Sequence, residues 1–214
     1  MNLVFAVASE FTILAQIRIS MRKSFYMLFF ISHLVFAQYP TDYFRSPLDI
    51  SINLSGTFGE LRSNHFHSGL DIRTNNIEGL PVYAAADGMV VRIKVSPFGY
   101  GKALYIAHPN GYTTVYGHLQ KFSDKIEAYV KEQQYRQKSF EVELYPSNIK
   151  VSQSEIIALS GNSGGSGGPH LHFEFRDTAS EKIINPMAFG MNELIKDETN
   201  PVISSLMVYP ANDS

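Results

Sequence analysis

The sequence predicts a mostly β fold, with antiparallel sheets that form an open groove and one helix inserted among the strands. From residue 52 onward, short apolar stretches are split by Gly, Pro and Asn, which is the pattern of strands joined by turns. One pair of stretches carries an Asn-Gly hairpin signal, and only residues 123–138 give a strong helix signal. A chain of 214 residues is long enough for one main domain with a sizeable core.

Charge and cysteine content exclude several classes of function. The formal net charge is -2, with no basic excess, so nucleic acid is not an expected partner. The chain has no cysteine, which excludes disulfides, thiolate catalysis and cysteine zinc sites. Any transition-metal site must therefore use His, Asp and Glu.

Residues 1–37 are predicted to be an upstream extension followed by a signal peptide. The stretch "MRKSFYMLFFISHLVFAQ" starts at Met21 with two basic residues, continues as a short apolar run and reaches the small residue Ala37. This layout predicts export to the periplasm or cell envelope, with cleavage near Ala37 and no stable membrane span afterwards. A retained N-terminal anchor is the alternative.

The first elements after the leader are predicted from their turns. Residues 38–51, rich in Tyr, Pro and Asp, are interpreted as a linker before a domain at 52–190. "LPVYAAADGMVVRIKV" gives two strands around an Asp87-Gly88 turn. "KALYIAHPNGYTTVYGHL" is a hairpin, in which Asn110-Gly111 is expected to supply the positive φ angles of a tight turn.

The second half of the domain starts with the helix. Residues 123–138 have Ser123 as a candidate N-cap and a weak apolar stripe. "SEIIALSG" and "HLHFEFR" are predicted strands, separated by the glycine-rich "NSGGSGG", which is expected to form a mobile wall of the cleft. Residues 191–214 are expected to form a C-terminal tail, which either packs back on the domain or is the start of a further domain that is cut short.

Three short glycine-containing motifs carry the candidate chemistry. "GPHLHFEF" places His170 and His172 at i and i+2, on one face of a strand. "HFHSGLD" contains His67 and Asp71, which would lie about 13 Å apart in a straight strand but could meet if the chain bends at Gly69. "VYGHL" places His118 at the end of the second hairpin strand.

These residue types suit a zinc hydrolase. Catalytic zinc takes three protein ligands of N and O type and keeps a fourth position for water. Two ligands from His67 and Asp71 and one from the 170/172 pair would satisfy this count, and the remaining histidines would be free for proton transfer and oxyanion stabilisation. Taken alone, each motif also fits a half-buried strand that happens to carry histidine.

The motifs "HSGLD", "YGHL" and "GPHLHFE" resemble, in the same order, the signatures of the LytM/lysostaphin-type zinc metallopeptidases, which cut peptide bonds in bacterial peptidoglycan. "GLPVYAAADGMVV" and "IIALSGNSGGSGGPHLHFEFR" are similar to further family text, and the resemblance covers roughly residues 52–190. It implies the LytM/lysostaphin-like fold, a duplicated hybrid motif, and a secreted zinc endopeptidase that hydrolyses peptidoglycan cross-links by metal-activated water.

Carried over by position, the resemblance assigns the metal to His67, Asp71 and His172, and catalysis to His118 and His170. It leaves open which imidazole is the base and which stabilises the oxyanion. His65 is interpreted as structural or as a residue that supports the metal ligands, and a direct role is the alternative. Residues 123–146 are longer than the corresponding part of compact family members and, because they follow His118, are expected to border the cleft.

Two alternatives to the peptidase belong to other functional classes. A non-enzymatic LytM-like regulator of cell-wall hydrolases would typically lack some of the five site residues, all of which are present here. A two-histidine phosphocarrier on a related scaffold would need neither an export signal nor the carboxylate of Asp71. The motifs therefore favour the secreted peptidase.

Overall fold

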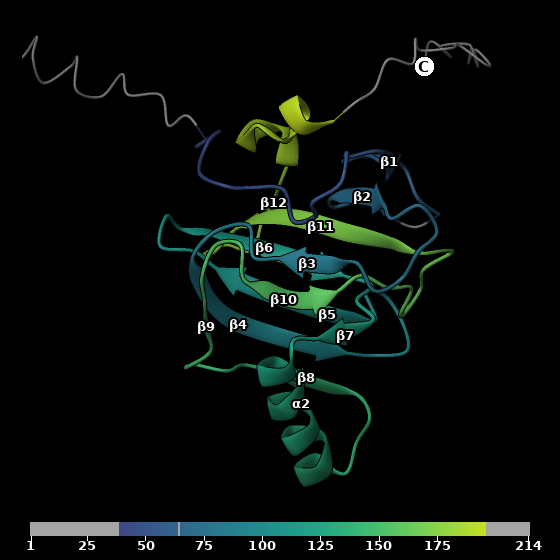
Figure 1. The fold of residues 1–214 in the computed structure, drawn as a ribbon, viewed down its shortest axis with the longest axis vertical. Coiled ribbons are helices and arrows are strands. Elements are labelled where there is room, and N and C mark those ends of the chain that lie inside the picture. The colour runs from purple at the N-terminus through teal and green to yellow at the C-terminus, as the bar shows by residue number, and fades with distance from the viewer. Residues whose placement is uncertain (1–38, 64, 196–214) are drawn as a thin grey trace, which may run out of the picture. The chain divides into compact units, whose positions relative to one another are not determined.

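The computed structural model describes residues 39–63 and 65–195, which form a two-layered β structure with one α-helix (Figure 1). The predicted signal peptide at 1–37 lies outside the described residues, as do residues 196–214 of the predicted tail. In the described part of the chain, no helix has the length and apolar character needed to cross a membrane.

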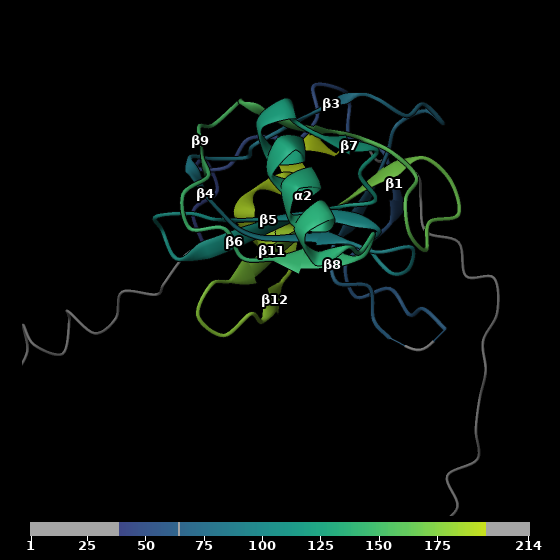
Figure 2. The same ribbon diagram turned by 90° about the horizontal axis from the view of Figure 1, so that it is seen from below.

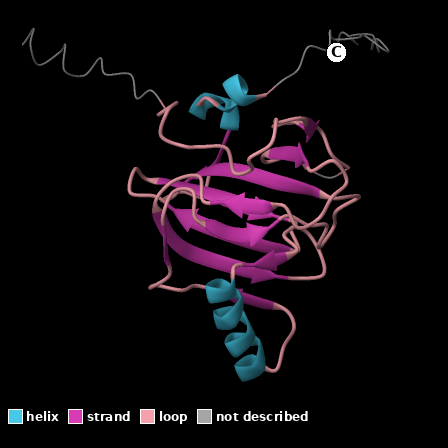
Figure 3. Cartoon of the chain, viewed as in Figure 1, coloured by secondary structure: helices cyan, strands magenta, loops and turns pink. Residues whose placement is uncertain are grey.

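Strands dominate the described residues, as Figure 3 shows. In chain order the elements are β1 (Leu54–Gly56), β2 (Leu70–Arg73), β3 (Pro81–Tyr83), β4 (Gly88–Val95), β5 (Lys102–Ala107), β6 (Tyr112–Gly117), β7 (Lys121–Phe122), α2 (Asp124–Gln137), β8 (Val142–Leu144), β9 (Lys150–Val151), β10 (Ile156–Leu159), β11 (His170–Asp177), β12 (Ile183–Ile184) and two 3-10 helices, η1 (Pro186–Phe189) and η2 (Met191–Leu194). The predicted mostly β class, with antiparallel sheets and one helix, is confirmed.

The strands form two sheets. The larger sheet has the order β1-β2-β11-β6-β5-β4-β8, with β12 added to β11 and β9 added to β4. The smaller sheet, β3-β10-β7, lies over one face of the larger one (Figures 1 and 2). The core lies between them, where Val82 and Ile157 of the small sheet belong to the same buried cluster as Phe173 of the large sheet.

Strand β11 shows why the large sheet has two different faces. Its side chains alternate, so every second residue points into the core: Leu171, Phe173 and Phe175. The residues between them share the opposite face: His170, His172, Glu174 and Arg176. The alternation thus turns apolar residues inward and aligns four polar side chains along one strand on the outer face.

The β5–β6 hairpin is present as predicted, but its turn differs from the predicted one. The backbone N–H of Gly111 donates to the carbonyl of His108, so Pro109 occupies the second position of a four-residue turn, which its fixed φ favours. Gly111 has φ of 86°, whereas Asn110 is not among the residues with positive φ. Only Gly111 supplies the left-handed conformation, because Pro109 has already turned the chain.

From Pro40 onward, the predicted linker at 38–51 is part of the folded domain. Phe44 is 5% exposed and packs edge-on against Phe175 and Phe189, and Leu48 is 2% exposed. At the other end of the domain, Ile195 pairs with Ile52 in an isolated bridge. The boundaries at 52 and 190 are therefore too narrow, because aromatic side chains in a Tyr- and Pro-rich segment complete the core.

Helix α2 lies away from the predicted cleft. It contacts β7 and β8, and β8 is the edge strand farthest from β1 and β2 in the order of the large sheet (Figure 1). Ile126 and Val130 are buried, and the Ser123 side chain makes no capping hydrogen bond. The expectation that residues 123–146 border the cleft is wrong, because the chain after His118 first runs through β7 in the other sheet.

Candidate metal centre and active site

His67 and Asp71 meet because the chain bends at Gly69, immediately before β2. His67 Nε2 lies 3.0 Å from Asp71 Oδ1. The bend was predicted, but the reason for glycine is different: Gly69 is not in the left-handed region. A Cβ at Gly69 would lie 2.3 Å from the carbonyl oxygen of Phe173, so glycine is needed for the close approach of this segment to β11.

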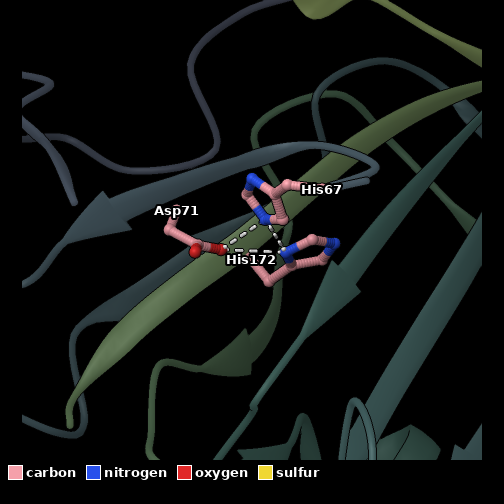
Figure 4. A group of neighbouring side chains, drawn as sticks. All are labelled: His67, Asp71 and His172. Carbon is pink, nitrogen blue, oxygen red and sulfur yellow. Dashed lines mark hydrogen bonds and ion pairs between the residues drawn. The ribbon is translucent and has the colours of Figure 1, made fainter. Parts of the chain in front are cut away.

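His172 reaches the same point from β11. Strands β2 and β11 are antiparallel, and their register sets His172 directly opposite Asp71. His172 Nδ1 lies 2.9 Å from Asp71 Oδ1 and 3.0 Å from His67 Nε2. Figure 4 shows the three side chains pointing toward one another, and all three are buried. These are the three residues for which the resemblance implied metal ligation.

The chemistry of these donors suits a cation. His67 Nδ1 lies 2.8 Å from the carbonyl oxygen of Thr57, and His172 Nε2 lies 2.8 Å from Oε1 of Glu174. Protons on these two outer nitrogens leave two imidazole lone pairs facing a carboxylate oxygen. Three acceptors have no hydrogen to share, and tetrahedral zinc with bonds of about 2.0–2.1 Å would hold its ligand atoms about 3.3 Å apart. The residues present therefore fit zinc.

The charge of Asp71 agrees with this role. Burial by itself would raise the pKa of Asp71, but the polar contacts of its carboxylate with the imidazoles of His170, His172 and His67 hold the pKa far below its usual value. Its second oxygen, Oδ2, accepts a hydrogen bond of 2.8 Å from Arg62. Asp71 is thus an anion with one oxygen bound by Arg62 and the other facing the two histidines.

His118 and His170 flank this centre. His118 Nδ1 lies 2.8 Å from the carbonyl oxygen of Ser163, and His170 Nδ1 lies 2.8 Å from that of Gly168. Both rings can therefore donate through Nδ1 to the backbone, which leaves each Nε2 as an acceptor. The ring centroids are 4.6 Å apart, and His170 Nε2 lies 3.5 Å from Asp71 Oδ1.

His118 has an unusual backbone conformation, and burial changes the pKa of its side chain. Its φ of 57° is in the left-handed region, directly after the last residue of β6. Burial lowers the pKa of His118 to about 4, although the hydrogen bond to the Ser163 carbonyl opposes this shift. His118 is therefore neutral near pH 7, with a free lone pair on Nε2.

A buried carboxylate behind His172 was not predicted from the sequence. Glu174 Oε1 accepts hydrogen bonds from His172 and Ser68 and from the hydroxyl of Tyr100, whose ring stacks on His172 at 4.7 Å. Glu174 Oε2 accepts a bond of 2.7 Å from Arg176. Burial opposes ionisation, but the bonds from His172 and Arg176 lower the pKa of Glu174 to about 2. The signal was its i+2 spacing from His172 in an apolar strand.

All five predicted site residues line one cavity of about 350 Å³. Gly165, Ser166 and Gly167 form part of its wall, as expected for the glycine-rich loop, which is tied by the N–H of Gly165 to the carbonyl of Gly99 at 2.8 Å. His65 is exposed at the edge of this cavity. No residue of 123–146 lines it.

Comparison with known proteins finds a family match. Residues 65–138 match the model of peptidase family M23. The chain is 32% identical over 149 residues to an uncharacterized metalloprotease of Haemophilus influenzae, covering 67% of this chain and 26% of the relative. It is 32% identical over 131 residues to the DD-carboxypeptidase/endopeptidase Mpg of Neisseria meningitidis, covering 61% and 24%. The chain thus spans about a quarter of the length of these curated relatives.

Solved structures agree on the fold. A zinc containing peptidase from Vibrio cholerae superposes with a TM-score of 0.50 at 27% identity, over 69% of this chain and 39% of that chain. The antimicrobial peptidase lysostaphin from Staphylococcus simulans superposes with a TM-score of 0.52 at 21% identity, over 77% and 61%. The lysostaphin-like fold implied by the sequence motifs is confirmed by this likeness.

Proposed function

Because this chain belongs to peptidase family M23, we propose that it is a zinc-dependent endopeptidase that hydrolyses peptide bonds in peptidoglycan cross-links. One observation carries the proposal: His67 Nε2, Asp71 Oδ1 and His172 Nδ1 lie about 3 Å from one another. The names of the relatives, which include a peptidoglycan DD-endopeptidase of Vibrio cholerae, support the substrate class.

In this proposal, His67, Asp71 and His172 hold the zinc ion. Zinc in such a site supplies Lewis-acid activation of water and of the scissile carbonyl. The protein contributes the fixed positions of the ligands: Thr57 and Glu174 hold the outer nitrogens of the two histidines, so that Nε2 of His67 and Nδ1 of His172 remain unprotonated.

His118 and His170 are proposed as the groups that move protons. Each has Nδ1 against a backbone carbonyl, so each Nε2 can accept a proton from the attacking water. The imidazolium formed then carries a donor at Nε2, which can stabilise the oxyanion or protonate the leaving amine. The lowered pKa of His118 keeps it in the form able to accept a proton at neutral pH.

The location of the enzyme is part of the proposal. The basic, apolar and small-residue layout of residues 21–37 supports export. A peptidoglycan substrate lies outside the cytoplasmic membrane, so export and substrate agree with each other. We propose the periplasm or cell envelope as the site of action.

Digestion of purified peptidoglycan tests the activity. The zinc-loaded protein is expected to release uncross-linked muropeptides from cross-linked ones, identified by mass spectrometry. His172→Ala should lose both bound zinc and hydrolysis, whereas His118→Ala should keep zinc while hydrolysis falls by about 10²–10⁴-fold. Zinc retained at full stoichiometry in His172→Ala would refute the ligand assignment.

A matched histidine variant controls for non-specific loss of metal. His65 lies at the edge of the same cavity but outside the ligand triad, so His65→Ala should keep its zinc. The same digestion also separates the enzyme from a non-enzymatic regulator of cell-wall hydrolases. Zinc binding without any muropeptide release by the wild-type protein would favour the regulator.

A further inference from the structure

A second cavity of about 590 Å³ lies next to the proposed active site. It shares Arg62, Asp71, Gly167 and His170 with the smaller cavity that contains the five site residues. A peptide bound at the metal centre would therefore extend into it. The other residues that line it are polar or small: Ser55, Arg73, Asn75, Asn76, Gly168 and Pro169.

Arg73 is one of the two arginines that line this second cavity. It ends β2 and pairs with His170 of β11, two positions along the ladder from the pair formed by Asp71 and His172. Residues 71 and 73 share one face of the strand, so the Arg73 side chain is on the face of the sheet that carries the site. Its Nε donates to the carbonyl oxygen of Leu54 at 3.0 Å, which fixes the guanidinium beside the cavity.

The two arginines that line the cavity differ in their partners. Arg62 is engaged by Asp71 at 2.8 Å and by Glu60 at 3.5 Å. Arg73 is exposed, and no ion pair joins it to any acidic residue in the described ranges 39–63 and 65–195. Asp71 is the one acidic side chain in the lining and is already bound by Arg62. A ligand in this cavity therefore meets an uncompensated guanidinium.

The wall beside Arg73 has an unusual backbone. Asn75 and Asn76 both have positive φ, 55° and 60°, in a turn closed by the N–H of Ile77 and the carbonyl of Thr74 at 3.0 Å. Asparagine tolerates this conformation better than most residues. Two consecutive left-handed residues set two amide side chains at the wall of the cavity, and amides can donate to an anion.

We propose that this cavity binds a free carboxylate of the substrate peptide, with Arg73 as the residue that recognises it. The substrate class is thereby narrowed to peptides that carry a carboxylate close to the scissile bond. A guanidinium presents a planar fork of donors that matches a carboxylate, and the tether to Leu54 reduces the entropy lost on binding. The inference rests on the proposed function, which places the reacting peptide at the metal centre.

Binding of two matched ligands tests the proposal. The probes are a cross-linked muropeptide dimer with free carboxylates and the same dimer with its carboxylates converted to carboxamides. Titration calorimetry uses the full chain loaded with zinc and carrying His118→Ala, so that the dimers are not cut. The carboxylate dimer is expected to bind at least about tenfold more tightly than the carboxamide dimer.

Substitutions of Arg73 separate its effect from that of the metal, which also attracts carboxylates. In the same His118→Ala background, Arg73→Ala should reduce the preference for the carboxylate dimer to near unity, and Arg73→Lys should restore part of it. Arg136→Ala removes the same charge from the exposed face of α2 and should leave the preference unchanged.

The outcomes distinguish this inference from the proposed function. Equal binding of the two dimers, no measurable binding, or a preference that survives Arg73→Ala would overturn the carboxylate site, even if the wild-type protein hydrolyses cross-links. A preference that depends on Arg73 in a protein that cuts neither dimer would support the carboxylate site and overturn the endopeptidase.

Discussion

Each histidine of the candidate site has one ring nitrogen held by an oxygen of the protein. Backbone carbonyls of Thr57, Ser163 and Gly168 hold three of the rings, and Glu174 holds the fourth, His172. These contacts fix the ring orientation and decide which nitrogen remains available. The kind of oxygen matters at His172, because the carboxylate of Glu174 increases the basicity of the ring more than a backbone carbonyl would.

Glu174→Gln is therefore expected to weaken zinc binding by about 10–100-fold. The neutral amide can still accept from His172 Nε2, but it loses the charge that pairs with His172 and Arg176. Zinc affinity is measured by competition with a chromophoric chelator, and folding is checked by circular dichroism. Glu181→Gln is the control, because Glu181 contacts Arg176 and Arg92 but not the site; equal affinities of the two variants would refute the role of Glu174.

The sequence predicts which residues of the site come together but not how their partners hold them. His67, Asp71 and His172 are recognisable because their motifs have fixed spacing around glycine. Arg62 and Glu174 were not predicted, because an Arg in a loop or a Glu within a strand is usually a solvated residue. The contact of Glu174 with Tyr100 spans 74 positions of the chain, which no local pattern specifies.

At the scale of elements, the strands were predictable and their assignment to sheets was not. The stretches around β3 and β4 were expected as two strands with a turn between them, and both strands exist. They belong to different sheets, because β3 pairs with β10 whereas β4 pairs with β5. Alternation of apolar residues shows that a strand has a buried face, but the same pattern fits any neighbour with a complementary face.

The approach of the His67 segment to β11 gives a prediction about stability. Gly69→Ala is expected to destabilise the protein by about 1–3 kcal/mol, because the new methyl group would lie 2.3 Å from the backbone oxygen of Phe173, which cannot rotate away. Gly167→Ala is the matched control, since a Cβ there meets nothing within 4 Å. Urea unfolding of both variants measures the difference, and equal stabilities would contradict the close approach.

At the scale of the whole molecule, the large sheet separates two environments. One face is buried against the small sheet and the aromatic side chains of the N-terminal segment, including Phe44. The opposite face carries the charged and titratable groups of the site. His108 is a titratable residue on the buried face instead: it is 5% exposed, and its ring centroid lies 5.1 Å from that of Phe44.

Burial of His108 favours its neutral form. Its Nδ1 lies 2.8 Å from the carbonyl oxygen of Asp87, and its Nε2 lies 2.8 Å from the hydroxyl oxygen of Thr114. The Thr114 hydroxyl donates at 3.0 Å to the hydroxyl of Tyr116, which also accepts from the N–H of Ala85. In agreement, burial lowers the pKa of His108, although the hydrogen bond to Asp87 opposes this shift.

The free energy of unfolding of the whole domain should therefore decrease as the pH is lowered, because His108 becomes protonated more easily in the unfolded chain. Because the pKa of His108 is lower in the folded state than its usual value of about 6.5, the unfolded chain takes up the proton first. The stabilisation by neutral His108 is complete above about pH 6.5 and decreases as the pH falls below it, by at most about 1.4 kcal/mol for each unit by which folding lowers the pKa.

The variant that tests this is His108→Asn, which keeps a donor for the carbonyl of Asp87 but cannot titrate. Urea unfolding at pH 7.5 and pH 5.0 should show the wild-type protein more stable at pH 7.5 and the difference between the two proteins smaller at pH 5.0. All other titratable groups are the same in both proteins, so a difference that stays constant between these pH values would show that His108 does not couple protonation to folding.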